Sequence, residues 1–336
     1  MSGVAVGIRL RAMGDVVLTT PALRSLAAAG HELHVVTESR FAPLLEGLPW
    51  VARVWAVERT GASTRAVAAA LRRLRPGVAV DFFGNPRSAL LARASGAAAI
   101  WGYELRGRRH FYTATVPRET RLPGGRREHA SAVHLRLARA AGGAATGPEP
   151  EIAIGPAARS EAARLFAAAG VAEPARTVGL VAAGSWPTKT WPISHSAILA
   201  RELSAAGFEV LLVCGPGEEG VARRLAALAP LVRVLPPCGV APLAAVIERL
   251  RAVVGTDSGP RHLAAALGVP SFAWFGPTHP DTWNPPGEAH GHWSTDLPCR
   301  ACDLTACAHW TCLPSLSPDA GSARVLAHLE RHPRHG

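Results

Sequence analysis

The sequence predicts an α/β protein made of two doubly wound units, and three observations support this prediction. Short apolar runs rich in Val, Ile and Leu alternate with segments whose apolar residues recur at helical spacing. The alternation stops at a stretch dense in glycine and proline, residues 142–150, and then starts again. Several apolar runs end in polar, glycine-containing turns, and in a parallel sheet such turns gather at the carboxyl edge, where ligands bind.

In the first half, four strands alternate with helices. We expect strands at residues 4–10, 34–37, 51–57 and 77–82, and helices at 16–29, 64–75, 89–94 and 129–141. Pro21 is tolerated in the first turns of the first helix. The polar segment 102–127 carries five arginines between Arg106 and Arg121 and is interpreted either as a solvated loop or as a surface facing an anionic acceptor.

The second half repeats this organisation without a tandem repeat. After a helix at 157–169, strands are expected at residues 177–182, 209–214, 232–235, 252–255 and 270–275. The predicted domains are therefore residues 1–147 and 151–316. Residues 317–336 follow as a C-terminal segment, whose helix would cross back to the first domain.

Asp15 ends the turn that follows the first strand. As an N-cap, its carboxylate would accept hydrogen bonds from the unpaired N–H groups of the helix. A carboxylate at a strand end can also act as a general base. Capping aspartates are the more common of the two, so the spacing alone favours the cap.

Two turns in the second half carry donors and acceptors suited to a nucleotide. Ser185, Thr188 and Lys189 supply hydroxyl and ammonium donors for a diphosphate, although a lysine in a surface loop is the simpler alternative. Glu218, in a glycine turn, could accept hydrogen bonds from ribose hydroxyls. It could equally interact with the dipole of the helix that follows.

Residues 253–280 read as strand, polar turn, helix and strand. The turn Asp257-Ser258-Gly259 directly precedes a helix N-terminus, whose free N–H groups favour an anion. We expect a phosphate or sugar site at this turn.

Composition limits the class of protein. Hydrophobic residues make up 48% and charged residues 18% of the 336 residues, which excludes a disordered chain. The net charge of +11 favours anionic partners, namely nucleic acid, anionic lipid or phosphorylated saccharide, but no nucleic-acid-binding pattern accompanies it. No apolar run reaches the roughly 18 residues of a membrane span, and no signal peptide is evident. We therefore expect a cytoplasmic protein.

Four cysteines lie close together near the C-terminus. The spacing of Cys299, Cys302, Cys307 and Cys312 favours a structural zinc site if a metal is bound, with His309 as a substitute ligand. Reduced free thiols are the leading alternative. An iron–sulfur cluster and a disulfide are further alternatives, the disulfide being disfavoured in a reducing compartment.

Several motifs together carry a family resemblance that extends over nearly the whole chain. They are Met13-Gly14-Asp15 with residues 19–23, the loop 186–192, the turn 215–218, and Asp257-Ser258-Gly259 with residues 262–267 and 275–278. With these motifs the chain resembles glycosyltransferase family 9, the ADP-heptose:lipopolysaccharide heptosyltransferase family. The resemblance implies the GT-B architecture, in which two Rossmann-like domains face each other across a cleft, with acceptor in the N-terminal domain and nucleotide sugar in the C-terminal one.

The resemblance also implies inverting transfer of heptose from ADP-heptose to the lipopolysaccharide inner core, with no metal or other cofactor required. Asp15 would be the general base, and Lys189 with Ser185 and Thr188 would neutralise the departing diphosphate. The remaining donor-binding residues would be Glu218 near the ribose, Asp257, Ser258 and Gly259 on sugar and phosphate, and His262 in the helix behind them.

On the first domain, Gly14, Arg87 and Ser88 are assigned to acceptor binding, because arginine can meet the carboxylates and phosphates of an anionic core. The positive charge leaves open a peripheral contact with the inner membrane surface. Two alternatives remain: transfer with another nucleotide sugar or acceptor, and a non-catalytic nucleotide-sugar or saccharide binding protein. Glycoside hydrolysis is disfavoured, because neither half shows the necessary pair of carboxylates.

Overall fold

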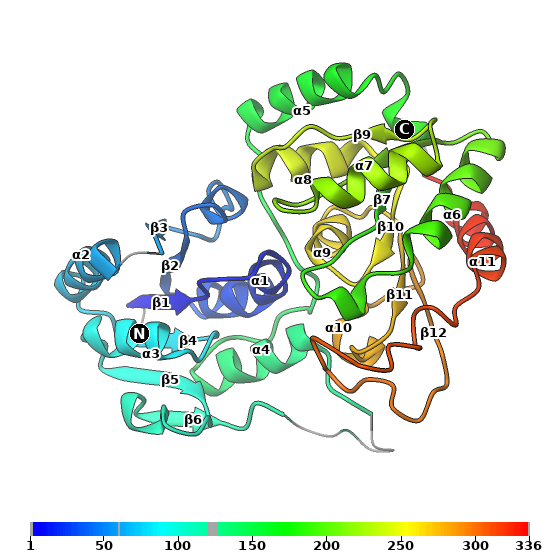
Figure 1. The fold of residues 1–336 in the computed structure, drawn as a ribbon. Coiled ribbons are helices and arrows are strands. Elements are labelled where there is room, and N and C mark those ends of the chain that lie inside the picture. The colour runs from blue at the N-terminus through cyan, green and yellow to red at the C-terminus, as the bar shows by residue number, and fades with distance from the viewer. Residues whose placement is uncertain (1–2, 60, 120–121, 123–125, 335–336) are drawn as a thin grey trace. The chain divides into compact units, whose positions relative to one another are not determined.

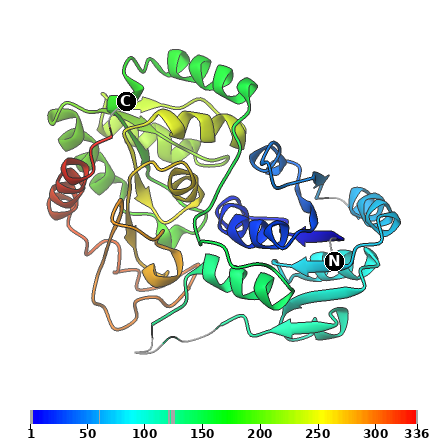
Figure 2. The ribbon, with the colours of Figure 1, turned by 180° about the vertical axis from the view of Figure 1, so that it is seen from behind.

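The chain divides into two compact units, Met1–Gly155 and Pro156–Gly336. The computed structural model describes residues 3–59, 61–119, 122 and 126–334. Figures 1 and 2 show each unit as a sheet covered by helices. Within the described residues, no helix combines the length and the apolar character needed to cross a bilayer.

The first unit contains a six-stranded parallel sheet in the order β3-β2-β1-β4-β5-β6. Its strands are β1 Val4–Ile8, β2 Glu32–Glu38, β3 Arg53–Val57, β4 Val78–Asp81, β5 Ala99–Tyr103 and β6 Ala114–Val116. Its helices are α1 Met13–Ala28, α2 Gly61–Arg73, α3 Pro86–Ala94 and α4 Ala130–Ala140, with 3-10 turns η1 Ala42–Leu44 and η2 Arg109–Phe111. Helix α1 packs against α4, and α2 packs against α3.

The second unit contains a six-stranded parallel sheet in the order β12-β11-β10-β7-β8-β9. Its strands are β7 Thr177–Val181, β8 Glu209–Leu212, β9 Arg233–Val234, β10 Ala252–Thr256, β11 Ser271–Phe275 and β12 His290–Ser294. Its helices are α5 Pro156–Ala169, α6 Ile193–Ala205, α7 Glu219–Leu228, α8 Val240–Arg249, α9 Gly259–Ala266, α10 Pro280–Trp283 and α11 Pro318–Arg331, with 3-10 turns η4 Pro174–Arg176 and η5 Pro187–Lys189.

Both sheets have the Rossmann order 3-2-1-4-5-6 when the strands are counted within each unit. The predicted α/β class with two doubly wound units is confirmed. In such a sheet the strand order reverses between the first and fourth strands, and ligands bind at the carboxyl ends of these two strands. The switch points lie between β1 and β4 in the first unit and between β7 and β10 in the second.

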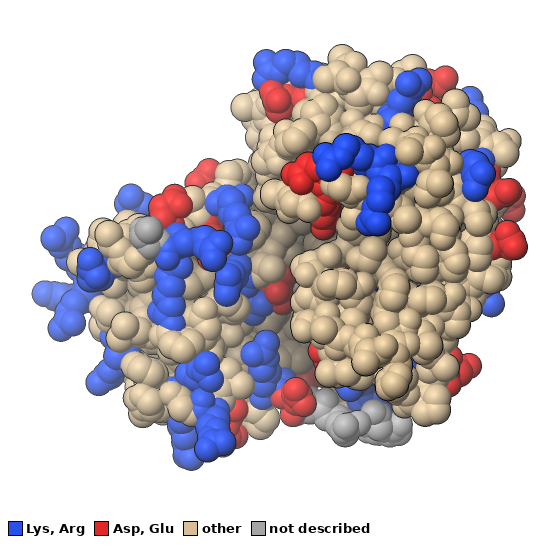
Figure 3. Space-filling view, in the orientation of Figure 1, with Lys and Arg blue, Asp and Glu red and all other residues tan. Residues whose placement is uncertain are grey.

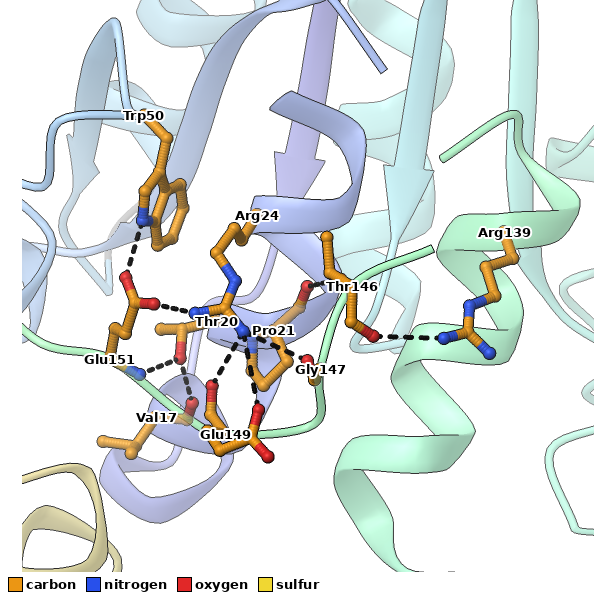
Figure 4. Close-up of polar contacts among 10 residues, drawn as sticks. All are labelled: Val17, Thr20, Pro21, Arg24, Trp50, Arg139, Thr146, Gly147, Glu149 and Glu151. Carbon is orange, nitrogen blue, oxygen red and sulfur yellow. Dashed lines mark hydrogen bonds and ion pairs between the residues drawn. The ribbon is translucent and has the colours of Figure 1, made fainter. Parts of the chain in front are cut away.

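Helix α1 begins earlier than the sequence suggested, and this changes the place of Pro21. The helix starts at Met13, so Pro21 lies in its interior and not in its first turns. A proline has no N–H to donate to the carbonyl four residues before it. The Thr20 hydroxyl instead donates to the Val17 carbonyl at 2.7 Å, which supplies that acceptor with a partner (Figure 4).

The glycine-rich stretch predicted as the domain linker belongs to the first unit. Arg24 of α1 forms an ion pair with Glu151 and donates to the Gly147 carbonyl at 3.1 Å (Figure 4). The Thr20 hydroxyl accepts from the Glu151 N–H at 2.9 Å, and the Ala153 N–H donates to the Leu44 carbonyl at 2.8 Å. These contacts hold residues 147–153 on the first unit, so the division falls after Gly155, later than the predicted boundary.

Two further predictions differ from the structure. Helix α11 packs against α6 and belongs to the second unit, whereas the sequence suggested a helix that crosses back to the first. The basic segment 102–127 is not a plain loop, because it contains η2 and the edge strand β6. Arg121, the last of its five arginines, lies outside the described residues.

Candidate active site

At the switch point of the first sheet, a buried arginine holds an aspartate. Arg9 follows β1 and is only 3% exposed. Its Nη2 lies 2.6 Å from Asp15 Oδ1, and its Nη1 donates to the Phe82 carbonyl, just beyond β4, at 2.6 Å. The side chain of Asp15 is 26% exposed. A carboxylate is therefore fixed beside the switch point and still reaches solvent.

The spacing favoured Asp15 as the N-cap of α1, but Asp15 does not occupy that position. The cap position is Ala12, and Asp15 is the third helical residue. Its Oδ2 accepts from the Ala12 N–H at 3.3 Å, so the carboxylate reaches back to the helix start in the way of a capping-box acid. Gly14 is buried in the same first turn.

The two other residues assigned to the acceptor are held by the protein itself. Ser88 is fully buried, and its hydroxyl donates to Asp81 Oδ2 at 2.9 Å, so the structure gives it a structural contact and its part in acceptor binding stays a prediction. Arg87 donates to the Thr64 hydroxyl at 2.8 Å and to the Glu58 carbonyl. It joins α3 to α2 and remains partly exposed.

At the switch point of the second sheet, a lysine and an aspartate meet from adjacent strands. Lys189 lies in the loop after β7, and Asp257 follows β10. Lys189 Nζ lies 3.0 Å from Asp257 Oδ2 and donates to the Asp257 carbonyl at 3.4 Å. Thr278, after β11, donates to the same Oδ2 at 2.8 Å. Three loops at the carboxyl edge of the sheet therefore converge on one carboxylate.

Asp257 is almost completely enclosed, at 4% exposure. Burial raises the pKa of its carboxyl, but the positive charges of Lys189, His262 and Arg261 outweigh burial and hold the pKa below its ordinary value. Asp257 therefore stays ionised, and its partner Lys189 is the member of the pair that reaches solvent, with a side chain 15% exposed.

Backbone geometry fixes this site. Gly255 has a φ of +150°, and a Cβ there would collide with the Val181 carbonyl of β7, so only glycine lets the two strands approach. The Thr256 hydroxyl donates to the Lys189 carbonyl, which ties the lysine loop to β10. Lys189 Nζ also lies 4.7 Å from the centre of the Trp186 ring, a cation–π contact.

The other residues predicted to bind the donor differ in their exposure to solvent. Ser185 is exposed, and Ser258 and Gly259 are partly exposed at the start of α9, where the Ser258 hydroxyl donates to the Thr256 carbonyl at 3.2 Å. Thr188 is buried, and its hydroxyl donates to the Leu304 carbonyl at 2.7 Å. Thr188 therefore anchors the segment around residue 304, and its hydroxyl is engaged there; its contact with a diphosphate stays a prediction.

Glu218 closes the turn in which it lies. Its Oε2 accepts from the Gly215 N–H at 2.7 Å, and Glu219 Oε1 accepts from the Gly217 N–H at 3.1 Å. Glu218 precedes α7, is partly exposed, and uses one carboxylate oxygen in this bond. His262 lies in the first turn of α9 at 4% exposure, behind Asp257.

Comparisons with known proteins agree with this geometry. The family model of glycosyltransferase family 9 (heptosyltransferase) matches residues 64–310. Lipopolysaccharide heptosyltransferase 1 of Pseudomonas aeruginosa is 30% identical over 325 residues, which cover 90% of this chain and 86% of that protein. The chain belongs to glycosyltransferase family 9. It is a glycosyltransferase of the heptosyltransferase family, as the sequence motifs predicted.

Solved structures of family 9 proteins share the fold over almost the entire chain. The glycosyl transferase family 9 structure from Veillonella parvula superposes with a TM-score of 0.85 at 21% identity, covering 98% of each chain. E. coli heptosyltransferase WaaC with ADP superposes with a TM-score of 0.73 at 24% identity, covering 98% of this chain and 100% of that one. The predicted GT-B type of fold is confirmed by these likenesses.

The zinc site considered for Cys299, Cys302, Cys307 and Cys312 is not shown by the structure and stays a prediction. Among the described residues, no group of three or more His, Cys, Asp or Glu side chains is arranged to hold a metal ion. Cys299, Cys302 and Cys307 are exposed, whereas Cys312 is partly buried against Gly276. Left-handed backbone at Ala301 and Asp303 turns the chain on both sides of the second thiol, Cys302. All six cysteines of the protein are free thiols.

Three residues of the family 9 site were missed in the sequence. Arg9 and Arg261 are each at most 3% exposed, and Thr278 is 1% exposed, so all three contribute from inside the protein. Arg261 donates to the Gly291 carbonyl at 3.1 Å, and burial lowers its pKa to about 10. An arginine directly after an apolar strand, as in Ile8-Arg9-Leu10, was the signal that could have identified the partner of Asp15.

Proposed function

We propose that this chain is an inverting, metal-independent heptosyltransferase that moves heptose from ADP-heptose to the lipopolysaccharide inner core. The name of the P. aeruginosa relative supports the sugar and the acceptor class, and the ADP in the WaaC structure suggests the nucleotide. The observation that carries the proposal is the Lys189–Asp257 pair at the switch point of the second sheet, because a fixed cation at the carboxyl ends of these strands suits the diphosphate of a nucleotide sugar.

In this proposal, Lys189 meets the diphosphate of the donor. Negative charge develops on ADP as the bond to the sugar breaks, and a cation that is already in position stabilises it without reorganisation. Asp257 acts through Lys189 as a positioning residue, because its carboxylate is enclosed and committed to Lys189 and Thr278. The N-terminus of α9, at Ser258 and Gly259, adds partial positive charge.

The rest of the donor would bind along the same edge of the sheet. Glu218 keeps one carboxylate oxygen for ribose hydroxyls, since its other oxygen accepts from Gly215. Ser185, exposed in the loop that carries Lys189, would donate to a phosphate oxygen. Thr188 and His262 would shape the site from behind, because both are buried.

On the acceptor side, Asp15 would be the general base. The acceptor hydroxyl oxygen attacks the anomeric carbon, and Asp15 takes its proton. The bond from that carbon to the ADP oxygen breaks on the opposite face, its electron pair passes to the phosphate, and the configuration inverts. Arg9 orients Asp15 through their ion pair, and Gly14 and Arg87 would border the acceptor.

The proposal assigns no metal to the transfer step, because Lys189 and the start of α9 supply the positive charge that a divalent cation would otherwise bring. The expected result is an unchanged rate of ADP release after exhaustive treatment with EDTA. A rate that collapses with EDTA and returns with added Mg²⁺ or Mn²⁺ would contradict this part of the proposal. We place the reaction in the cytoplasm, where free thiols such as the six of this chain persist.

The decisive experiment measures ADP release from ADP-heptose with a heptose-deficient core saccharide as acceptor. We expect ADP release that requires the acceptor, together with a product whose new glycosidic bond has the inverted configuration. Binding of ADP-heptose without any ADP release would favour a non-catalytic binding protein. Other nucleotide sugars are tested in parallel. If one of them released its nucleotide faster than ADP-heptose releases ADP, it would be the donor, and the proposed roles of the site residues would stand.

A further inference from the structure

A long irregular segment, residues 295–317, joins β12 to α11 and is drawn in orange in Figure 1. The structure describes every residue of this segment, and none of them belongs to a helix or a strand. Irregular connections of more than about 15 residues are uncommon in compact domains and usually serve a function. The proposed transfer gives this segment no part, and its contacts with the rest of the second unit indicate one.

The segment is bonded to the loop that carries Lys189. The Thr188 hydroxyl donates to the Leu304 carbonyl at 2.7 Å, and the Trp310 indole N–H donates to the Thr188 carbonyl at 3.2 Å. Because the Thr188 carbonyl and the Lys189 N–H belong to one planar peptide group, the second bond fixes the backbone that precedes the lysine. The Trp310 ring packs against the hydrophobic core of the unit, so this donor has a fixed position.

The same segment is bonded to the loop that follows β11. The Ala301 N–H donates to the Gly276 carbonyl at 3.4 Å, and the Asp303 N–H donates to the Pro277 carbonyl at 2.8 Å. The next residue of that loop is Thr278, whose hydroxyl donates to the enclosed carboxylate that pairs with the lysine. The segment therefore holds a second loop of the candidate donor site through its backbone.

Residues 301–310, which we call the clasp, join the two loops from which Lys189 and Thr278 reach Asp257. Lys189 Nζ lies 3.0 Å from Asp257 Oδ2, and the Thr278 hydroxyl lies 2.8 Å from the same oxygen. A loop that moved away would leave an enclosed charge without one of its partners, which costs free energy. The clasp therefore helps to hold the lysine at this carboxylate.

The backbone on the other side of Lys189 is held by the sheet itself. The Thr256 hydroxyl, at the end of β10, donates to the Lys189 carbonyl. The two peptide groups that flank the lysine are thus held by different parts of the unit, one by the clasp and one by the sheet. Loss of the Trp310 bond loosens the first of these peptide groups and leaves the Thr256 bond in place, so it should shift the lysine while the sheet keeps its structure.

We propose that the clasp positions Lys189 for the diphosphate of the donor, with Trp310 as a positioning residue. This inference rests on the proposed function, in which Lys189 meets that diphosphate. Trp310 acts through the peptide group before the lysine and makes no contact with the donor in this scheme. Its effect on the reaction arises because a charge-assisted bond from an ammonium group to a phosphate requires the two to lie at the correct distance.

The position of Lys189 can be measured without a ligand, because it is the only lysine of the chain. Basic side chains are numerous on the face shown in Figure 3, but 35 of the 36 basic residues are arginines, which stay protonated and do not react with acetic anhydride. The test is the rate at which acetic anhydride modifies Lys189 in the whole chain, followed by peptide mass spectrometry. The ion pair with Asp257 protects the amine, so this rate reports how often the pair opens.

Trp310→Phe keeps an aromatic ring and loses the indole N–H. We expect Lys189 to be acetylated roughly three- to tenfold faster in this variant, the factor that one hydrogen bond provides. The matched control is Trp293→Phe, at another partly buried tryptophan that packs against the same core, and it should react like the wild type. Thr188→Val, which removes the other bond between the lysine loop and the clasp, should also accelerate acetylation and decides the matter if Trp310→Phe does not fold.

Titration with ADP gives the second readout. Trp310→Phe should bind ADP roughly three- to tenfold more weakly than the wild type, and the same substitution should have no further effect in a Lys189→Met background. A tryptophan with only a structural role would weaken binding equally in both backgrounds, because independent effects add.

Three results would overturn the proposal: acetylation of Lys189 at the wild-type rate in a folded Trp310→Phe, an equal acceleration in Trp293→Phe, and equal losses of ADP affinity in the two backgrounds. A different result would count against the enzyme proposal alone. If acetylation accelerates as expected but Lys189→Met binds ADP like the wild type, the clasp stands as the element that positions the lysine, and the proposed function of Lys189 fails.

Discussion

At the residue scale, the two aspartates of the candidate site differ in their access to water. The side chain of Asp15 is 26% exposed and that of Asp257 is 4% exposed. A general base must come within hydrogen-bond distance of the proton that it removes. Of the two, only Asp15 has the exposure that the proposed general base needs, whereas Asp257 is enclosed beside Lys189.

The first prediction concerns Asp15→Asn. The amide keeps the size of the side chain and can still lie beside Arg9, but it cannot accept a proton. We expect kcat to fall by roughly 10²- to 10⁴-fold, the usual contribution of a general base, with unchanged affinity for ADP-heptose. Steady-state kinetics and calorimetric titration of the donor measure the two quantities. As a control, Glu46→Gln changes an exposed acid of the same unit that lies outside the proposed site and should leave kcat alone. Turnover near the wild-type rate in Asp15→Asn would make Asp15 a purely structural helix residue.

The second prediction concerns Lys189→Met, which removes the cation and keeps most of the side-chain volume. Affinity for ADP should fall roughly 10- to 100-fold, the equivalent of about 1.5–3 kcal/mol for a hydrogen bond to a charged group. The free energy of unfolding should fall by about 3 kcal/mol, because the buried Asp257 carboxylate loses its partner. Titration with ADP and urea unfolding measure these losses. Arg201→Met, at an exposed site of the same unit, is the matched control.

The loss of stability in Lys189→Met should depend on pH, because it arises from the Asp257 carboxylate. In the wild type the pKa of Asp257 is lowered, so its contribution to stability is complete above the unfolded value of 3.8 and is lost as the pH falls through the folded pKa. Without Lys189, burial is the largest influence and raises that pKa. The stability gap between variant and wild type should therefore be largest near pH 7 and shrink toward pH 4. A gap that stays constant over this range would show that Asp257 is not the source of the defect.

At the element scale, the sequence was informative wherever an element is long and apolar. The strands of both switch points were predicted from their apolar runs, because a strand buried on both faces reads as such a run. The edge strands β6 and β12 were missed. Strand β6 has only three residues, too few for a recognisable alternation, and β12 contains two histidines and a glycine and has no β-branched residue.

The candidate site was predictable in its residue types but not in its pairings. Spacing identified Asp15, Lys189 and Asp257, since each follows a recognisable strand. It could not show that Lys189 binds Asp257, because that contact joins residues 68 positions apart and depends on β7 lying beside β10. The same limit applies to Thr188 and Ser88. The sequence does not show that their hydroxyls donate hydrogen bonds to other residues of the fold, the Leu304 carbonyl and the Asp81 carboxylate.

The third prediction concerns the contacts that hold the connector on α1. In Arg24→Met, the ion pair with Glu151 and the bond to the Gly147 carbonyl are lost (Figure 4). We expect residues 147–151 to detach from α1 and to become sensitive to a glutamate-specific protease, which would cut after Glu151. The rate of cleavage should rise at least tenfold, because proteolysis follows the population of the open segment.

The matched control for this experiment is Arg159→Met. Arg159 forms an ion pair with Glu248 at 2.8 Å in the second unit, so the variant breaks a comparable contact away from the connector. Its cleavage after Glu151 should equal that of the wild type. Unchanged cleavage in Arg24→Met would show that the other bonds of the connector, at Thr20 and Leu44, are sufficient to hold it.

At the scale of the whole molecule, buried histidines should make the two units differ in their response to acid. In the second unit, His328 is 2% exposed, and burial lowers the pKa of His290 and of His328 to about 4. In the first unit, His134 lies against Tyr103 at 2.6 Å, and burial lowers its pKa well below 6.5. All three are neutral in the folded protein near pH 5, whereas an unfolded histidine is mostly protonated there.

The unfolded state therefore takes up protons that the folded state does not, and stability falls as the pH drops below about 6.5. Each such histidine lowers the free energy of unfolding by about 1.4 kcal/mol per pH unit, or about 2 kcal/mol on going from pH 7 to pH 5. The second unit has at least two such histidines, and burial also lowers the pKa of His292 there, whereas the first unit has one. In the first unit, burial also raises the pKa of Asp81, so the folded state binds a proton there at a higher pH than the unfolded state does and recovers part of the loss.

We therefore predict that the second unit loses at least twice as much stability as the first between pH 7 and pH 5. Urea titrations followed by hydrogen exchange and mass spectrometry can follow peptides of each unit separately. The variant His328→Leu removes one of the titrating groups and should reduce the acid sensitivity of the second unit by about 2 kcal/mol between pH 7 and pH 5, while the first unit responds as before. If the first unit unfolds at lower urea concentration than the second at pH 5 but not at pH 7, the assignment of acid sensitivity to His290 and His328 is wrong.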